Sequence, residues 1–365
     1  MSSHLADGTL PRPTSAPAAP IVWNDTARQA AFETWLQAAA PTWGLRTETL
    51  RSASSDASFR RYFRIDAEAG HSCIVMDAPP PQEDVRPFVD MAARIANAGL
   101  NAPQVLAQDA AQGFLLLTDL GAQLYLQALV EARQQARPQA GAALMGDAIA
   151  ALVQWQCRVA PDGLPAYDDA LLRRELALFP EWCVQREHGT TWSADEQAVW
   201  DKTCDALVAS ALKQPSVVVH RDYMPRNLMV ASPNPGILDF QDAVRGPISY
   251  DVASLIRDAF FSWEEDQEID LAVRYWQAAR AAGLPVEADF GEFWRQLEWM
   301  GLQRHFKVLG IFCRLKHRDG KPKYSEDLPR FFHYAHKVAN RYNLLRPMCL
   351  LLEPLMGETR SEAFY

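Results

Sequence analysis

Hydrophobic and polar positions follow two different patterns along the chain. From residue 45 to residue 118, short apolar segments rich in aromatic and β-branched residues alternate with turns of Ser, Asp and Gly, which is typical of strands. The strands predicted from this pattern are 46–50, 59–65, 72–76, 105–107 and 114–118. Two amphipathic helices accompany them, at 25–40 and at 85–98, and the second ends at Gly99, a residue favoured directly after a helix.

Beyond Gly121 the apolar positions recur every three or four residues over long stretches, which is the pattern of amphipathic helices. The predicted helices are 124–136, 142–158, 171–186, 194–212, 250–262, 269–282, 290–314 and 328–341. We therefore predict an α+β fold with a small antiparallel β-rich N-lobe at 25–118 and a larger helical C-lobe at 119–365. Residues 1–24, rich in Pro, Ala and Ser, are predicted to form a disordered leader.

The most informative motif lies where an apolar run, 217–219, opens into a polar loop. The loop carries a His-x-Asp sequence ending at Asp222, and Asn227 follows five residues later. A turn at 231–236 then returns the chain as a second short strand that ends at Asp239, so a hairpin brings Asn227 and Asp239 together. This arrangement predicts phosphoryl transfer, with Asp222 accepting or orienting the proton of an acceptor hydroxyl. Asn227 and Asp239 offer the oxygen ligands that Mg²⁺ prefers beside the phosphates of ATP.

The composition is that of an ordinary globular protein and argues against several classes of function. A chain of 365 residues with 48% hydrophobic residues can build a substantial core. The net charge of −9 disfavours a nucleic-acid partner, because phosphate backbones are held chiefly by clustered Lys and Arg. The six cysteines are scattered without a C-x-x-C pair, which predicts reduced, largely buried thiols. Neither a signal segment nor a membrane-spanning run is recognisable, so we expect a cytoplasmic location and no membrane partner.

Four longer segments carry a resemblance to a known group of enzymes. Residues 56–64, 74–80, 238–247 and 301–312 resemble the aminoglycoside phosphotransferase and choline kinase branch of the kinase-like superfamily. Within that branch they are most similar to the bacterial kinases that phosphorylate N-acetylmuramate and N-acetylglucosamine at the anomeric carbon. The resemblance implies a two-lobed, protein-kinase-like fold, with ATP and Mg²⁺ as cofactors. It also implies a sugar α-1-phosphate product, formed during recycling of cell-wall peptidoglycan, and it implies no protein partner.

The predicted nucleotide site departs from the usual kinase pattern, because the third strand, 72–76, lacks the lysine that meets the α- and β-phosphates. We expect an arginine near the second strand to replace it. Hydroxyls of the turn before that strand could donate to phosphate oxygens, although the turn has no glycine. The segment 114–121 resembles the hinge whose backbone pairs with adenine. The predicted nucleotide-binding residues are Ser58, Arg60, Arg61, Arg64, Leu117, Asp119 and Leu120.

The sugar pocket is predicted from the resemblance and from the chemistry of the acceptor. An acetamido sugar is neutral and a lactyl ether adds a carboxylate, so the pocket should combine hydrogen-bonding groups, an aromatic platform and an arginine. The candidates are Glu175, Trp182, Arg245, Arg304 and His305. Two further residues are expected to be structural: His220 should shape the catalytic loop, and Asp251, at the start of a helix, should accept backbone N–H groups and brace that loop.

Other functions remain compatible with the motif. The same fold could phosphorylate an aminoglycoside or an amino alcohol such as choline, and the acidic residues within 264–270 could attract such a cation, although they equally suit a solvated helix start. The missing strand lysine and glycine loop are also compatible with a catalytically silent nucleotide sensor. A protein kinase is disfavoured, because no Ala-Pro-Glu follows Asp239 to anchor an activation segment.

Overall fold

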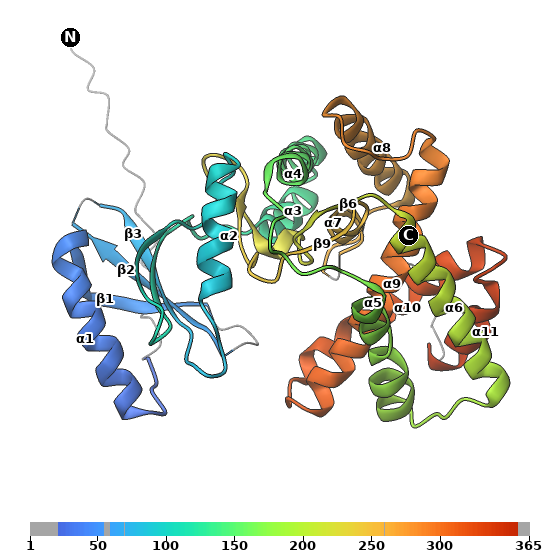
Figure 1. Cartoon of the computed structure of the whole chain (residues 1–365), viewed down its shortest axis with the longest axis horizontal. Coiled ribbons are helices and arrows are strands. Elements are labelled where there is room, and N and C mark those ends of the chain that lie inside the picture. The colour runs from blue at the N-terminus through green and yellow to red at the C-terminus, as the bar shows by residue number, and fades with distance from the viewer. Residues whose placement is uncertain (1–20, 55–58, 69, 259, 357–365) are drawn as a thin grey trace, which may run out of the picture. The chain divides into compact units, whose positions relative to one another are not determined.

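The computed structural model describes residues 21–54, 59–68, 70–258 and 260–356. Most of the predicted leader therefore lies outside the described residues. The chain forms two compact units, which Figure 1 shows coloured by residue number. The first unit extends to residue 86 and includes 104–119, and the second comprises 87–103 together with the chain from residue 120 onward.

The first unit is an antiparallel sheet with one long helix packed on it. Its strand order is β1-β2-β3-β5-β4. The helix α1 (Thr26–Trp43) begins at Asp25, whose carboxylate accepts the N–H groups of the first turn, and ends at Gly44 in the left-handed conformation. Apolar side chains of α1 and of the inner strands form one buried cluster. The strands are β1 (Leu45–Ser54), β2 (Arg61–Ala67), β3 (Ser72–Asp77), β4 (Val105–Asp109) and β5 (Phe114–Thr118).

The second unit is mainly helical, and its longest helix, α9, is buried along most of its length. The α-helices are α2 (Arg86–Asn97), α3 (Tyr125–Gln134), α4 (Pro138–Arg158), α5 (Asp169–Leu176), α6 (Ala194–Lys213), α7 (Tyr250–Ile256), α8 (Glu265–Ala281), α9 (Phe290–His317), α10 (Leu328–Arg341) and α11 (Cys349–Leu352). A π-helix, η1 (Phe179–Glu187), and short 3₁₀ turns at 225–227, 322–327, 346–348 and 353–355 complete it. The β-rich sheet and the helical majority confirm the predicted α+β class.

The helix α2 belongs to a different compact unit from the lobe in which we predicted it. We expected α2 in the N-lobe, but it groups with the second unit. Phe88 of α2 packs on Phe240 with ring centroids 4.7 Å apart, and the Nη1 of Arg94 donates to the carbonyl oxygen of Ala160 at 2.7 Å. These contacts join α2 to the predicted hairpin that carries Asn227 and Asp239 and to the residues that follow α4, so α2 groups by its packing rather than by its place in the sequence.

Two predicted helices are shorter than the apolar pattern indicated. The segment predicted as one helix at 171–186 is divided into α5 and η1, with Pro180 in the first turn of η1, where a residue without an N–H group is tolerated. The helix predicted at 250–262 ends at Ile256, and Arg257 leaves the helical conformation. Its guanidinium turns inward to Glu268 and Glu298, so an ion pair ends the helix before the apolar pattern does.

Two small strand pairs position the loops of interest in the second unit. β6 (Ser216–Val219) pairs with β9 (Val244–Pro247), and β7 (Leu228–Met229) pairs with β8 (Gly236–Ile237), both antiparallel. The predicted hairpin is therefore present. Because its two strands are only two residues long, the residues that leave them stay close together.

The cysteines and the lengths of the helices can be compared with the expectations from composition. All six cysteines are free, and five of them are buried while Cys157 is exposed. Within the described segments, no helix combines the length and apolarity needed to cross a membrane.

Candidate active site

The loop after β6 is held by a buried carboxylate from α7. Asp251 is fully buried, and its two oxygens accept the backbone N–H groups of His220 at 2.7 Å and Arg221 at 3.0 Å. Arg221 has a positive φ of 77°, which is uncommon outside glycine, so these two hydrogen bonds stabilise an unfavourable turn. The N-cap of α7 is Ser249 rather than Asp251. Burial, together with the charge of Asp222, raises the pKa of Asp251 to about 7, against the effect of the two N–H donors.

His220 has a neutral, buried ring whose two nitrogens bond to the backbone. Its Nε2 lies 3.0 Å from the carbonyl oxygen of Leu238, so this nitrogen carries the proton, and Nδ1 accepts the backbone N–H of Asp222 at 3.3 Å. Burial lowers the pKa of His220 to about 4, although the charge of Asp222 opposes this shift. The ring therefore ties the catalytic loop to the strand that leads to Asp239, as a structural residue would.

The three residues predicted to act on the phosphoryl group lie together. The Nδ2 of Asn227 donates to the backbone oxygen of Asp222 at 2.9 Å and lies 3.4 Å from Oδ2 of Asp239. The Nε2 of Gln241 donates to the other oxygen, Oδ1, at 2.8 Å. Asp239 has a φ of 62°, which turns its carboxylate toward Asn227 as the chain leaves β8. Since the amide nitrogen of Asn227 is bonded to Asp222, its amide oxygen can serve as a metal ligand.

Two cationic side chains of α9 lie close to Asp222. Its side chain is 39% exposed, and the Nη2 of Arg304 lies 4.0 Å from its Oδ1. Burial favours the neutral acid, but the charges of Lys307 and Arg304 outweigh it and lower the pKa of Asp222. Asp222 is therefore a carboxylate at neutral pH, ready to accept a proton in a hydrogen bond.

Glu175 lies behind the catalytic loop in a buried ionic cluster. Its Oε1 receives both the Nη2 of Arg221 at 2.6 Å and the Nζ of Lys307 at 3.1 Å, and its Oε2 accepts the hydroxyl of Tyr167. Burial favours protonation, but Lys307 and Arg221 lower the pKa of Glu175. Glu175, a predicted sugar ligand, thus braces Arg221.

Sequence reasoning did not single out Lys307, although its segment was recognised. Lys307 is buried, and its Nζ also donates to the hydroxyl of Tyr250 at 3.1 Å. Burial disfavours its charged form, but Tyr250 and Glu175 raise the pKa of Lys307, so the ammonium group stays charged. One signal was available: Lys307 lies three residues after Arg304 on α9, which places both side chains on neighbouring positions of one helix face.

The remaining sugar-pocket candidates lie in different environments. Arg304 is buried beside Asp222, whereas the next residue, His305, stacks on Tyr334 with centroids 5.0 Å apart, and burial lowers its pKa well below the usual range. Trp182 is partly exposed on η1. Arg245 is exposed on β9, and its Nε donates to the carbonyl oxygen of Leu164 at 3.2 Å. Arg304 is thus the candidate that the structure brings next to Asp222.

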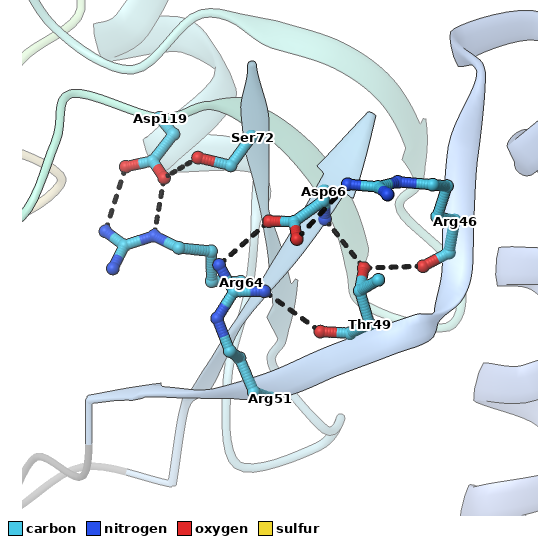
Figure 2. A network of polar contacts seen from close by, with 7 residues as sticks. All are labelled: Arg46, Thr49, Arg51, Arg64, Asp66, Ser72 and Asp119. Atoms are coloured by element: carbon cyan, nitrogen blue, oxygen red, sulfur yellow. Dashed lines mark hydrogen bonds and ion pairs between the residues drawn. The ribbon is translucent and has the colours of Figure 1, made fainter. Parts of the chain in front are cut away.

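In the first unit each predicted nucleotide-binding arginine pairs with a carboxylate. The Nε of Arg60 lies 2.9 Å from Oε2 of Glu83, and the Nε of Arg61 lies 3.0 Å from Oδ2 of Asp77. Figure 2 shows Arg64 bonded through two nitrogens to Asp119, which also accepts the hydroxyl of Ser72. Asp119 was itself a predicted nucleotide ligand.

The other nucleotide-site predictions concern the hinge and the turn. Leu117 is buried in β5, where it pairs with Ile74 of β3. Leu120 begins the second stretch of the second unit, and its Cδ1 lies against Gly236 of the catalytic hairpin, where an added Cβ would come within 2.8 Å. Ser58 lies outside the described residues.

The geometry described above agrees with comparisons to known proteins. Residues 49–290 match the model of the protein family described as "Phosphotransferase enzyme family". The chain belongs to this family. An N-acetylmuramate/N-acetylglucosamine kinase of Pseudomonas putida is 50% identical to this phosphotransferase over 322 residues, which cover 88% of this chain and 91% of the relative. A kinase of the same name from Pseudomonas aeruginosa is 48% identical over 339 residues, covering 91% and 98%.

A solved structure extends the similarity to the fold. A choline/ethanolamine kinase family protein from Mesorhizobium loti has a TM-score of 0.59 at 16% sequence identity, covering 90% of this chain and 99% of its own. Together the matches confirm the resemblance to the aminoglycoside phosphotransferase and choline kinase branch. The phosphotransferase is an enzyme that transfers a phosphoryl group to a hydroxyl acceptor.

Proposed function

We propose that this phosphotransferase is an ATP- and Mg²⁺-dependent sugar kinase that phosphorylates the anomeric hydroxyl of N-acetylmuramate and N-acetylglucosamine. Its product would be the sugar α-1-phosphate, formed in the cytoplasm during recycling of peptidoglycan. The observation that carries the proposal is the hydrogen-bonded group of Asp222, Asn227 and Asp239. The names of relatives about half identical to the chain support the choice of acceptor.

Asp222 is the group we assign to the acceptor hydroxyl. Its carboxylate stays ionised because Lys307 and Arg304 counteract the effect of burial, and more than a third of the side chain is open to an incoming ligand. A carboxylate that accepts the hydroxyl's hydrogen bond orients one oxygen lone pair toward the phosphorus and takes the proton as the bond forms. The brace of Asp251 on the loop backbone keeps this carboxylate in place.

Asn227 and Asp239 are the residues that would hold Mg²⁺. An amide oxygen and a carboxylate suit this hard cation, which takes few protein ligands when phosphate oxygens complete its coordination. Their side chains already approach each other to 3.4 Å, and the left-handed backbone of Asp239 directs its carboxylate to the shared side. When bound, the ion neutralises charge on the phosphates during transfer.

For the triphosphate we favour Arg60 among the three arginines. Protein kinases pair the phosphate-binding lysine with a glutamate of a helix, and Arg60 pairs with Glu83, which lies three residues before α2. Arg61, in contrast, shares the buried carboxylate of Asp77 with Arg28, and Arg64 is held by two bonds to Asp119. We therefore assign the Arg61–Asp77 and Arg64–Asp119 ion pairs to stabilising the first unit rather than to binding phosphate.

Two acidic residues at the start of α8, Glu265 and Glu268, are already paired with cations of the chain. Glu265 pairs with Lys337 at 3.4 Å and with Arg341, and Glu268 pairs with Arg257 at 3.2 Å. Because these carboxylates are already neutralised by cations of the chain, they offer little charge to an aminoglycoside or a choline.

One experiment tests the proposed function directly. The purified protein is incubated with Mg²⁺, labelled ATP and each amino sugar, and the new phosphate is located by phosphorus-coupled NMR. We expect coupling to the anomeric proton, and none in reactions with Asp222→Asn. Transfer to another hydroxyl, or turnover only with kanamycin or choline in a parallel panel, would refute the proposed acceptor. A thermal shift with Mg-ATP but no turnover on any acceptor would indicate a nucleotide sensor instead.

A further inference from the structure

Arg304 has an unusual environment for a buried arginine. Its side chain is only 4% exposed, yet its Nη1 finds no hydrogen-bond acceptor among the residues that the structure describes. Its Nη2 lies 3.9 Å from the sulfur of Met224, a weak acceptor, and 4.0 Å from Oδ1 of Asp222, beyond hydrogen-bond reach. The planar donor fork of Arg304 is therefore buried beside the catalytic carboxylate without an anion bonded to it.

The fully buried Arg257 differs from Arg304 in having carboxylates within hydrogen-bond reach. Its Nη2 lies 3.2 Å from Glu268 and 2.9 Å from Glu298, although its Nε and Nη1 also find no acceptor among the described residues. A guanidinium removed from water without such a partner is unfavourable, since the lost hydration is not replaced. A site of this kind is stabilised when a ligand supplies the missing acceptor, and a fork of parallel N–H groups fits a carboxylate or a phosphate.

Cationic side chains lie close to Asp222. Arg221 and Lys307 share a single oxygen of Glu175, and Arg304 lies 4.0 Å from Asp222. The carboxylate of Asp251 bonds to backbone N–H groups of the loop rather than to these side chains. The cations beside Asp222 would therefore also attract an acceptor that carries a negative charge.

We propose that Arg304 binds the lactyl carboxylate of N-acetylmuramate and thereby sets a preference for this sugar over N-acetylglucosamine. This inference rests on the proposed function. The two sugars differ in the lactyl ether, whose carboxylate is the only ionised group of the acceptor. With the anomeric hydroxyl at Asp222, the fork of Arg304 lies on the adjoining, more deeply buried side, because Arg304 is 4% exposed and Asp222 39%.

A competing role for the fork is contact with the phosphoryl group in transit. Comparing acceptors distinguishes these two roles of Arg304. Only N-acetylmuramate carries the carboxylate, whereas the phosphoryl group is transferred to every acceptor. Three acceptors are needed: N-acetylmuramate, its neutral lactyl carboxamide, and N-acetylglucosamine. The carboxamide keeps the size of the lactyl group and removes only its charge.

The experiment compares kcat/KM for these acceptors in the wild-type enzyme and in Arg304→Gln. We expect the wild type to prefer the acid over the carboxamide by about 10- to 100-fold, the range expected for a hydrogen-bonded charge pair. In Arg304→Gln this ratio should fall to near one. Any uniform loss caused by an altered Asp222 cancels in the ratio. Calorimetric titration of each protein with the acid, without nucleotide, should show the same loss in binding.

Arg314→Gln is the matched control. It removes the same charge from the same helix, ten residues and about 15 Å further along, and it should keep the wild-type ratio. Melting temperatures of both variants report whether the fold is intact. Should Arg304→Gln not fold, Arg304→Lys keeps the charge but loses the fork and should retain only part of the preference.

The outcomes separate this inference from the proposed function. Equal losses for all three acceptors in Arg304→Gln, with an unchanged ratio, overturn the carboxylate contact and assign the fork to the phosphoryl group. A wild-type enzyme with no preference for acid over carboxamide overturns it without any variant. Turnover of neither sugar by the wild type would instead reject the proposed function, and this inference with it.

Discussion

The two units of the chain treat their arginines differently. In the sheet of the first unit, Arg61 and Arg64 bond directly to carboxylates that are nearly inaccessible, Asp77 and Asp119. Beside the catalytic loop of the second unit, Arg304 lies 4.0 Å from Asp222, beyond hydrogen-bond reach, and its Nη1 has no acceptor among the described residues. Complete pairing stabilises a fold, whereas incomplete pairing prepares a site for an anion at a cost in stability.

The largest expected effect comes from removing Asp222, the carboxylate of the second unit that we assign to the acceptor hydroxyl. Asp222→Asn should lower kcat by ~10²- to 10⁴-fold, because a general base and an orienting charge are lost. The melting temperature and the affinity for Mg-ATP should stay close to those of the wild type. Near-normal kcat in a steady-state assay would contradict the role assigned to Asp222.

Removing the carboxylate of Glu175, which Arg221 and Lys307 share, should lower the stability of the fold as well as the activity. Glu175→Leu leaves the buried Lys307 and the partly buried Arg221 without their shared anion, and such a change typically costs about 3–5 kcal/mol in the free energy of unfolding. Chemical denaturation at pH 7 measures it. The exposed ion pair of Arg173 and Asp169 on α5 offers the control, since Asp169→Ala should change stability by less than about 1 kcal/mol.

His220 should make the catalytic loop sensitive to acid. Its pKa of about 4 in the folded protein is below the value of about 6.5 in the unfolded chain, so the unfolded state binds a proton first as pH falls. The stability that depends on neutral His220 is complete above pH 6.5 and is lost as pH falls toward 4. We expect the wild type to lose roughly 3 kcal/mol more than His220→Gln between pH 7 and pH 4, measured by urea denaturation. Parallel losses in both proteins would exclude His220 as the source.

The smallest expected effect is on the KM for ATP, and it compares the arginines of the first unit with one another. Arg60→Ala should raise the KM for ATP by about tenfold, as expected when one charge-assisted contact to phosphate is lost. Arg64→Ala should leave this KM unchanged and lower the melting temperature, since Arg64 of β2 pairs with Asp119, which directly follows β5. If all three variants, including Arg61→Ala, keep the wild-type KM, none of these arginines replaces the missing lysine.

Local patterns predicted the secondary structure well where packing agreed with them. The strands of the first unit and the catalytic hairpin follow from alternating apolar residues and turn residues, which act over a few positions. The pattern failed at 171–186 and beyond Ile256, where an apolar period continued through a proline and through an inward-facing arginine. Periodicity reports the buried face of a segment but not the point at which a long-range ion pair ends it.

What the sequence by itself determined is therefore the chemistry of the hairpin: Asp222, Asn227 and Asp239 are close in the chain, and one turn suffices to join them. Only the tertiary structure decided which charge meets which. Lys307 reaches Glu175 across 132 residues of chain, and Arg304 reaches Asp222 across 82. Such pairs depend on the packing of α9 against the catalytic loop and α5, and the free energy of each pair depends on burial, which local sequence does not encode.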